Sequence, residues 1–398
     1  MQTMRIDPDA TLYEITENWP ETVPVFTRQG FPQMAEEDLR RSFGSRISLR
    51  QALALKNLDL DGFVEQLEAT IEPEATVAVG VAPTRVVGLL PCPVRIPLLE
   101  AFEPFIEDYQ RSTGCKVEYE LQAASMGAAW IDENLKHVSR EEDLPELFIS
   151  AGFETFFDPK GLGRFRDAFY DGLPYKTFNS SFDGVDLRDP EGRYSVISVV
   201  PAVFMVNMNE LGDQPVPQSW EDLLDPRFEQ RVSLPVGDFD LFSAILIEIH
   251  RRYGEDAVRR LGRSLATSMH PSQMIKLGRK SSAPIVTIMP YFFTRMAKEG
   301  GPMKAVWPSD GAIISPIFLL ARKSAATQVQ PIIDFFASKE IAEILAHKGL
   351  FPSTRPDVDN RLDSGSTFGW PGWEFIRQQD VASLIERCQQ LFDEGRES

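Results

Sequence analysis

The sequence predicts an α/β protein with two lobes joined by two crossing strands, preceded by a small all-α domain. Apolar positions at helical spacing fill roughly the first 70 residues. From Arg85 onward, strand and helix patterns alternate, as in a mostly parallel sheet. Two long apolar runs, 196–206 and 312–320, bracket a block of about 110 residues. A fold of two discontinuous lobes requires two such crossings.

The segment 1–70 is expected to be the small helical domain. "DATLYEITENWP" offers Asp9 as a helix start, and Gly30 ends the next helical pattern. Ser48 and Asp59 are the expected starts of two more short helices. Residues 71–83 are rich in proline, alanine and valine with little charge, which indicates a linker.

The order of patterns after residue 83 divides the rest of the chain. Lobe 1 is expected to hold residues 84–200 and 312–360, lobe 2 residues 201–311, and a C-terminal helical extension residues 361–398. In the extension, Trp370, Trp373 and Phe375 precede a helix expected from Asp380. These aromatic residues either clamp that helix onto a lobe or form a dimer contact.

Composition limits the function classes. The net charge of −18 argues against a nucleic-acid or anionic-lipid partner. No apolar run is long enough to span a membrane, and the start of the chain does not read as a secretory signal. The three cysteines form no C-x-x-C motif. These features predict a cytoplasmic protein with reduced thiols.

The patterned segments resemble type II periplasmic solute-binding proteins, and most of all the ferric-iron-type receptors of ABC importers. The similarity lies in "FEPFIEDYQRSTGCKVEYE", "LPELFISAG", "VPQSWEDLLDPRFEQRVSLP", "DGAIISPIFLLARKSA" and "PIIDFFASKEIAEILAHKGLFPST". It implies a solute held in a cleft between two α/β lobes, with hinge closure around it.

The first segment resembles a small domain of unknown function that also begins the di-iron proteins that repair iron–sulfur clusters. The similar stretches are "ATLYEITENWPETVPVFTRQGF" and "SLRQALALKNLDLDGFVEQL". The cysteines that commonly follow the glycine in those relatives are absent, since Phe31 follows Gly30. We therefore expect residues 1–70 to dock a protein partner or to dimerise.

Ligands of α/β sheets bind beyond the carboxyl ends of the strands, where helix N-termini supply free N–H groups. The corner Pro91-Cys92-Pro93 is expected to line the cleft, with Tyr291 facing it from the other lobe. The remaining candidate ligand-binding residues are Val94, Arg95, Ser125, Met126, Gly127, Glu154, Asp238 and Asp310. The amides of Val94 and Arg95 and the helix start at Ser125 are expected to meet a polar or anionic group.

Several candidates also have a structural interpretation. Cys92 is either a reactive thiol or a small filler, and Ser125 either contacts ligand or caps its helix. Asp238 and Asp240 either bind a cation or cap the helix expected near Leu241. Asp310 either contacts ligand or forms a turn with Gly311.

The resemblance implies Fe(III) bound by paired tyrosines, but "YFF" retains only Tyr291, with Glu154 as the other metal candidate. Fe(III) prefers hard oxygen donors, so a small polar or anionic solute fits better than the bare ion. The predicted function is a sensor, carrier or scavenger that needs no cofactor. The alternatives are an enzyme on the same fold that uses Cys92, and a scaffold that docks a partner through residues 1–70.

Overall fold

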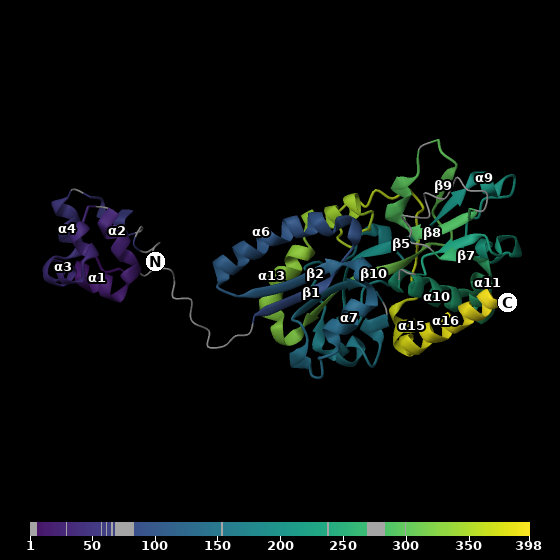
Figure 1. The fold of residues 1–398 in the computed structure, drawn as a ribbon, viewed down its shortest axis with the longest axis horizontal. Helices are drawn as coiled ribbons and strands as arrows, with labels where there is room; N and C mark the ends of the chain where they lie inside the picture. The colour runs from purple at the N-terminus through teal and green to yellow at the C-terminus, as the bar shows by residue number, and fades with distance from the viewer. Residues whose placement is uncertain are drawn as a thin grey trace. The chain divides into compact units, whose positions relative to one another are not determined.

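The computed structural model describes residues 6–398 except 29, 57, 61, 65–66, 68–82, 153, 237–238, 269–282 and 299. The chain divides into two compact units, unit 1 (Met1–Ala82) and unit 2 (Pro83–Ser398), both drawn in Figure 1. The predicted linker 71–83 forms the end of unit 1 except for Pro83, which begins unit 2, and all of it but Pro83 lies outside the described residues.

Unit 1 is helical, as predicted. Its described helices include α1 (Leu12–Asn18), α2 (Val23–Arg28), α3 (Glu37–Phe43) and α4 (Leu49–Leu55). Ser48 caps α4 in a capping box with Gln51. The prediction that Asp9 begins the first helix is wrong, because Thr11 caps α1 in a capping box with Glu14. Asp9 instead accepts a hydrogen bond from Arg50.

Unit 1 has its own core and one open groove. Leu12, Ile15, Phe26 and Leu49 are completely buried in that core. On its surface, a groove of about 880 Å³ is lined mainly by the ends of α3 and α4, where 78% of the surface of Leu55 is exposed. That unit 1 docks a partner or a second copy stays a prediction.

In lobe 1 of unit 2, three parallel strands lie side by side. β1 (Thr84–Leu90) pairs with β2 (Val117–Ala123) on one side and β3 (Leu147–Ala151) on the other. In Figure 1, α6 (Arg95–Thr113) and α7 (Gly127–Leu135) lie on opposite sides of these strands. The lobe is completed by α8 (Glu154–Phe157), α13 (Ala326–Phe336), α14 (Lys339–Glu343) and the π-helical η14 (Ile344–Lys348).

Lobe 2 has a second set of parallel strands. β6 (Val232–Leu234) pairs with β7 (Leu265–Ser268) and β8 (Val286–Pro290). The lobe also contains β9 (Met303–Val306), α9 (Met208–Leu211), α10 (Phe239–Tyr253) and α11 (Glu255–Ser264). Gly254 separates α10 from α11 and directly precedes the first residue of α11.

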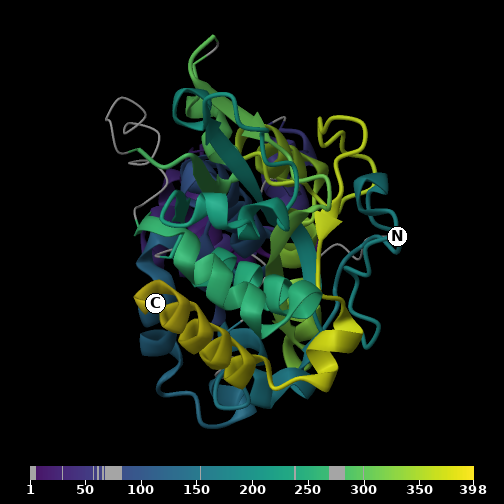
Figure 2. The ribbon, with the colours of Figure 1, turned by 90° about the vertical axis from the view of Figure 1, so that its right-hand side faces the viewer.

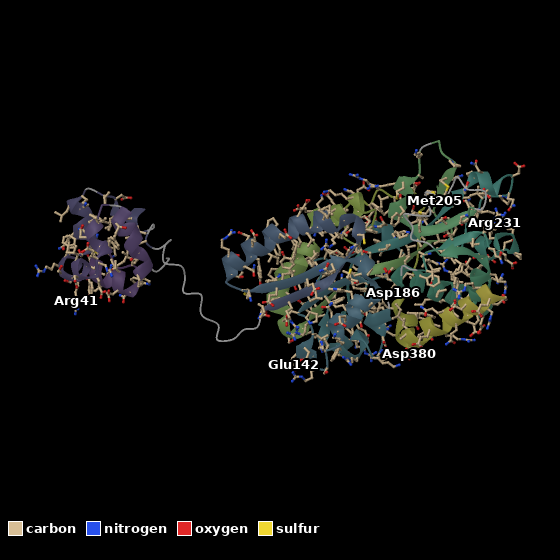
Figure 3. The ribbon with its side chains drawn as sticks, viewed as in Figure 1. Arg41, Glu142, Asp186, Met205, Arg231 and Asp380 are labelled. Carbon is tan, nitrogen blue, oxygen red and sulfur yellow. The ribbon has the colours of Figure 1, made fainter. Side chains whose placement is uncertain are left out.

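Two long antiparallel strands, β5 (Ser195–Asn207) and β10 (Ala312–Arg322), connect the lobes. β10 pairs with β3 and with the short β4 (Phe169–Tyr170) in lobe 1. β5 pairs with β10 as far as Pro201 and with β8 from Ala202 onward. Every residue of β5 is buried, including Met205, which Figure 3 labels. The predicted fold class, two lobes with two crossing strands, is confirmed.

The C-terminal segment contacts both lobes. It contains β11 (Phe368–Gly369), α15 (Trp373–Gln378) and α16 (Val381–Glu397). Trp373 stacks on Tyr194 of lobe 1 at 5.5 Å between ring centroids, and its indole donates a hydrogen bond to the Leu187 carbonyl. Figure 2 shows α16, in yellow, lying along the helices of lobe 2, where Phe392 packs against Phe242. The buried tryptophans support the clamping interpretation.

Asp380 caps α16, as predicted, by accepting a hydrogen bond from the Ser383 amide (Figure 3). None of the helices in the described part of the chain combines the length and the apolar character that crossing a membrane requires.

Candidate ligand site at the junction of the lobes

The pairing register of the strands brings the carboxyl ends of the parallel strands of both lobes toward one junction. At the carboxyl end of β3, Ala151 pairs with Ile317, which in turn pairs with Ser198. At the carboxyl end of β8, Pro290 pairs with Ala202. Ser198 and Ala202 are four residues apart on β5, a rise of about 13 Å. The strands that run parallel to β3 and β8 therefore end at this junction too.

Short turns or helices follow these strand ends, and we call them the junction corners. In lobe 1 they are η4 (Cys92–Val94) after β1, η5 (Ala124–Met126) after β2, and α8 after β3. In lobe 2 they are η12 (Tyr291–Met296) after β8, and the start of α10 after β6. Most of the predicted site residues lie on or directly beside these corners.

At the corner after β1, one candidate side chain is exposed to solvent, and the groups of two other candidates are engaged within the protein. Cys92 is exposed, whereas Val94 is completely buried. The Val94 amide donates to the Pro91 carbonyl at 3.0 Å, so it is not free to meet a ligand. The Arg95 guanidinium donates to the Leu121 carbonyl at 3.2 and 3.3 Å. Of this corner, the Cys92 thiol is the group most open to a solute.

The corner after β2 differs in detail from the prediction. The helix begins at Gly127 and not at Ser125, and no side chain caps it. Gly127 has φ +68°, which only glycine adopts readily, and this sets where the helix can start. Ser125 is exposed, and within the described part of the chain its hydroxyl has no hydrogen-bond partner. Met126 is 53% exposed beside it.

Across the junction, Tyr291 packs edge-on against Trp307 at 5.2 Å between ring centroids. Burial raises the pKa of the Tyr291 hydroxyl, the Asp363 carboxylate raises it further, and Arg295 opposes them. Fe(III) is bound by the phenolate form.

Arg295 links the corner of lobe 2 to lobe 1. Its guanidinium donates to the carbonyls of His347 and Lys348, with a distance of 2.9 Å to Lys348. These carbonyls belong to η14, which lies against η4. The corners that carry Cys92 and Met296 therefore adjoin the same helical segment.

Among the acidic candidates, Asp310 is engaged inside the protein, whereas Glu154 lies on a junction corner. The Asp310 carboxylate accepts hydrogen bonds from the Trp220 amide and the Tyr253 hydroxyl, both at 3.0 Å. Gly311 donates to the Pro308 carbonyl, as the turn interpretation requires. Glu154 is the first residue of α8. Asp238 lies outside the described residues.

Asp240 does not cap its helix, contrary to the structural interpretation of that residue. It is the second residue of α10, is buried, and accepts a hydrogen bond from Ser315 of β10 at 3.1 Å. The helix begins two residues earlier than the sequence indicated. Asp240 therefore ties α10 to a crossing strand.

The residues of the junction corners include oxygen-bearing side chains, such as Tyr291 and Glu154, and sulfur-bearing ones, such as Cys92 and Met126. Within the described part of the chain, no group of three or more histidine, cysteine or acidic residues could hold a metal ion. Met296, at the end of η12, is 40% exposed and was not among the sequence candidates.

Comparisons with known proteins agree with this architecture. Residues 142–379, more than half of the chain, match the family described as bacterial extracellular solute-binding protein, and the match runs into the C-terminal segment. Residues 6–64 match a domain of unknown function, DUF1858. No curated protein sequence matches the chain.

Solved structures show the same fold at low sequence identity. Iron-bound HitA from Pseudomonas aeruginosa has a TM-score of 0.54 at 14% identity, covering 78% of this chain and 99% of its own. A ferric binding protein from Campylobacter jejuni has a TM-score of 0.53 at 16% identity, covering 78% and 98%.

The periplasmic binding protein AfuA from Actinobacillus pleuropneumoniae, solved with fructose-6-phosphate, has a TM-score of 0.53 at 16% identity, covering 80% and 100%. In each of these comparisons, the covered share of this chain is close to the share of the chain that unit 2 makes up. With the family match and the junction of two lobes on two crossing strands, the chain belongs to the bacterial extracellular solute-binding protein family.

Proposed function

We propose that this protein binds one small solute at the junction corners and acts as a carrier, sensor or scavenger of that solute. One observation carries the proposal. The register of β5 and β10 directs the carboxyl ends of parallel strands from both lobes toward each other. Solutes of α/β proteins bind at such strand ends, and binding between lobes lets a hinge close on them.

The contacts at the corners favour a neutral or cationic solute over the anionic one first expected. Arg95 is held by the Leu121 carbonyl, and the Val94 amide is used within its own turn. The positive charge and one of the amides invoked for an anion are therefore already engaged. Binding is also favoured over catalysis, because an adjacent base is one of the ways in which a protein activates a thiol. Within the described part of the chain, no hydrogen bond joins Cys92 to one.

A cytoplasmic location is a separate part of the proposal. Its support is the small number of cysteines, all of which are free among the described residues. Fractionation of cells expressing the full-length protein tests it. Recovery with a cytoplasmic marker enzyme is expected, and recovery with a periplasmic marker would contradict it.

The site is tested by blocking it. Native mass spectrometry of freshly purified protein identifies a retained solute, and a thermal-shift panel of metal ions and small organic solutes extends the search. Ser125→Trp places a large ring on an exposed corner and should abolish both signals without unfolding the protein.

Ser112→Trp is the matched control. Ser112 is also exposed, but it lies near the far end of α6, about 25 Å along the helix from its first residue. It should leave binding unchanged. Equal binding by Ser125→Trp and the natural protein would refute the junction as the site.

A further inference from the structure

We propose that unit 1 binds the same unit of a second copy of the chain, through an interface in which α3 of one copy lies antiparallel to α3 of the other. Four exposed residues form this interface together with the groove beside them, and we call them the α3 face: Glu36, Leu39, Phe43 and Arg46. The inference goes beyond the proposed function, because it concerns self-association of the chain and not its solute.

The first argument is that α3 lies wholly at the surface of unit 1. None of its seven residues is buried, and Leu39 and Phe43 are 41% and 39% exposed. A helix this short is marginal in water and normally gains its stability by packing an apolar side against other residues. Leu39 and Phe43 are four residues apart and therefore lie on the same side of the helix. Unit 1 thus leaves the apolar side of α3 open to solvent.

The second argument is that this side of α3 borders the groove of unit 1. Phe43 and Arg46 line the groove from α3 and η3 (Gly44–Arg46), and Leu55 lines it from α4 (Figure 1). Leu39, Phe43 and Leu55 are three of the seven exposed large apolar side chains in the described part of the chain. Exposed apolar side chains that gather in one place mark an interaction surface.

The third argument is the order of charges along α3, which indicates what covers this surface. Glu36, Glu37 and Asp38 lie at the start of the helix, and Arg46 follows its other end. Among the described residues, no ion pair or side-chain hydrogen bond engages Glu36 or Arg46. A partner with one sign of charge would be repelled at one of the two ends. A second copy turned end for end presents the opposite charge at both.

The positions of the four residues agree with a two-fold axis. Residue 41 is halfway between 36 and 46, and also halfway between 39 and 43. When two copies of α3 lie antiparallel with the axis at this position, Glu36 of each copy faces Arg46 of the other, and Leu39 faces Phe43. Each pair then occurs twice, as a contact between identical surfaces requires. The spacing of three, four and three residues also keeps all four on one side of a helix.

The test is sedimentation equilibrium of the full-length protein at concentrations from about 1 to 100 µM. We expect a monomer–dimer equilibrium with a micromolar Kd, because the α3 face is only about 15 Å long and small interfaces are weak. Leu39→Ala and Phe43→Ala should each weaken the dimer by about tenfold or more, since each change occurs twice. Both residues are exposed, and calorimetry checks that unit 1 still folds.

Charge reversal tests the antiparallel register. Glu36→Arg and Arg46→Glu should each weaken self-association by about tenfold or more, because like charges then face each other at both ends. An equimolar mixture of these two variants should form a mixed dimer about as tight as the natural one, because opposite charges meet again. The double variant should dimerise with itself for the same reason.

Arg41→Glu is the matched control on the same helix. Arg41, labelled in Figure 3, is exposed and two residues away from both Leu39 and Phe43. Residues two apart on a helix do not share a side, so Arg41 lies off the α3 face. This variant changes the charge of the chain as Arg46→Glu does, and it should dimerise like the natural protein.

A monomer at all these concentrations would overturn the inference, as would a dimer that Leu39→Ala, Phe43→Ala and Arg46→Glu leave unchanged. Equal weakening by Arg41→Glu and Arg46→Glu would also overturn it, because the effect would then follow net charge and not position. Failure of the mixed variants to associate would overturn the antiparallel register. Ser125→Trp should leave the dimer intact, so loss of the dimer and loss of solute binding can be told apart.

Discussion

The three cysteines of the chain differ sharply in environment. Cys92 is exposed at a corner, whereas Cys388 is completely buried in α16, and burial raises the pKa of the Cys388 thiol to about 12. The thiolate is the reactive form of cysteine. The two residues should therefore react with alkylating reagents at very different rates.

At pH 8, a maleimide should modify Cys92 of the native protein first and leave Cys388 unmodified until the protein unfolds. Peptide mass spectrometry of a time course measures this, and Cys92→Ser should remove the fast phase. Labelling of Cys388 at the rate of Cys92 would contradict the packing described for α16.

Tyr175 gives a pH dependence with a definite sign. Burial raises the pKa of its hydroxyl to about 12, from an ordinary value of about 10. Because the Thr354 hydroxyl donates to the Val196 carbonyl at 2.7 Å, the Tyr175 hydroxyl donates to Thr354, at 2.9 Å. The folded protein holds the Tyr175 proton more tightly than the unfolded chain does. The associated stability is complete below pH 10 and is lost as pH rises from about 10 to about 12.

Urea unfolding at several pH values measures this effect. The free energy of unfolding should fall by about 2 kcal/mol across that window from Tyr175 alone. Tyr175→Phe should cost about 1 kcal/mol at neutral pH through the lost hydrogen bond, and should make the alkaline decline shallower. An identical decline in this variant would contradict the assignment.

At the scale of elements, the sequence predicted a helix start correctly where a single capping residue determines that start. Ser48 and Asp380 cap their helices as expected, because each carries a side-chain acceptor directly before an apolar pattern. Asp9 failed because Thr11, two residues later, forms a complete capping box with Glu14. Ser125 failed because the positive φ of Gly127 sets the helix start. The sequence alone does not show which of two neighbouring candidate residues begins the helix.

The C-terminal segment gives a sharp test of packing. Trp373 is completely buried, stacks on Tyr194 and binds the Leu187 carbonyl. Trp373→Ala should lower the free energy of unfolding of unit 2 by about 3–5 kcal/mol. Phe375→Ala, at a half-buried position in the same helix, should cost clearly less. Equal losses, measured by denaturant titration, would contradict the clamping role of Trp373.

At the scale of the whole molecule, the separate cores of the two units predict two unfolding transitions. Leu53→Ala in unit 1 should lower only the transition of unit 1, by about 2–5 kcal/mol. Phe204→Ala in β5 should lower only that of unit 2 by a similar amount. Calorimetry of the full-length variants measures both, and a shift of both transitions by either variant would show that the units are coupled.

Much of this architecture was predictable because buried crossing strands read as unbroken apolar runs. The runs 196–206 and 312–320 correspond to β5 and β10 almost residue for residue. The junction corners were predictable because each directly follows the carboxyl end of an apolar strand. The contacts across them were not, since Arg295 meets carbonyls 52 and 53 residues away, and Tyr291 turns onto Trp307. The Arg295 contacts depend on how the lobes meet, and the Tyr291 contact depends on packing within lobe 2; no local pattern encodes either.

The central claim is that a solute binds at the junction of the two lobes. Hydrogen–deuterium exchange, with and without the solute that gives the largest thermal shift, tests it most directly. The account predicts slower exchange of the amides in residues 92–99, 124–131 and 291–297, with no change in α1–α4 of unit 1. Protection confined to unit 1, or to strands and helices remote from these corners, would contradict it.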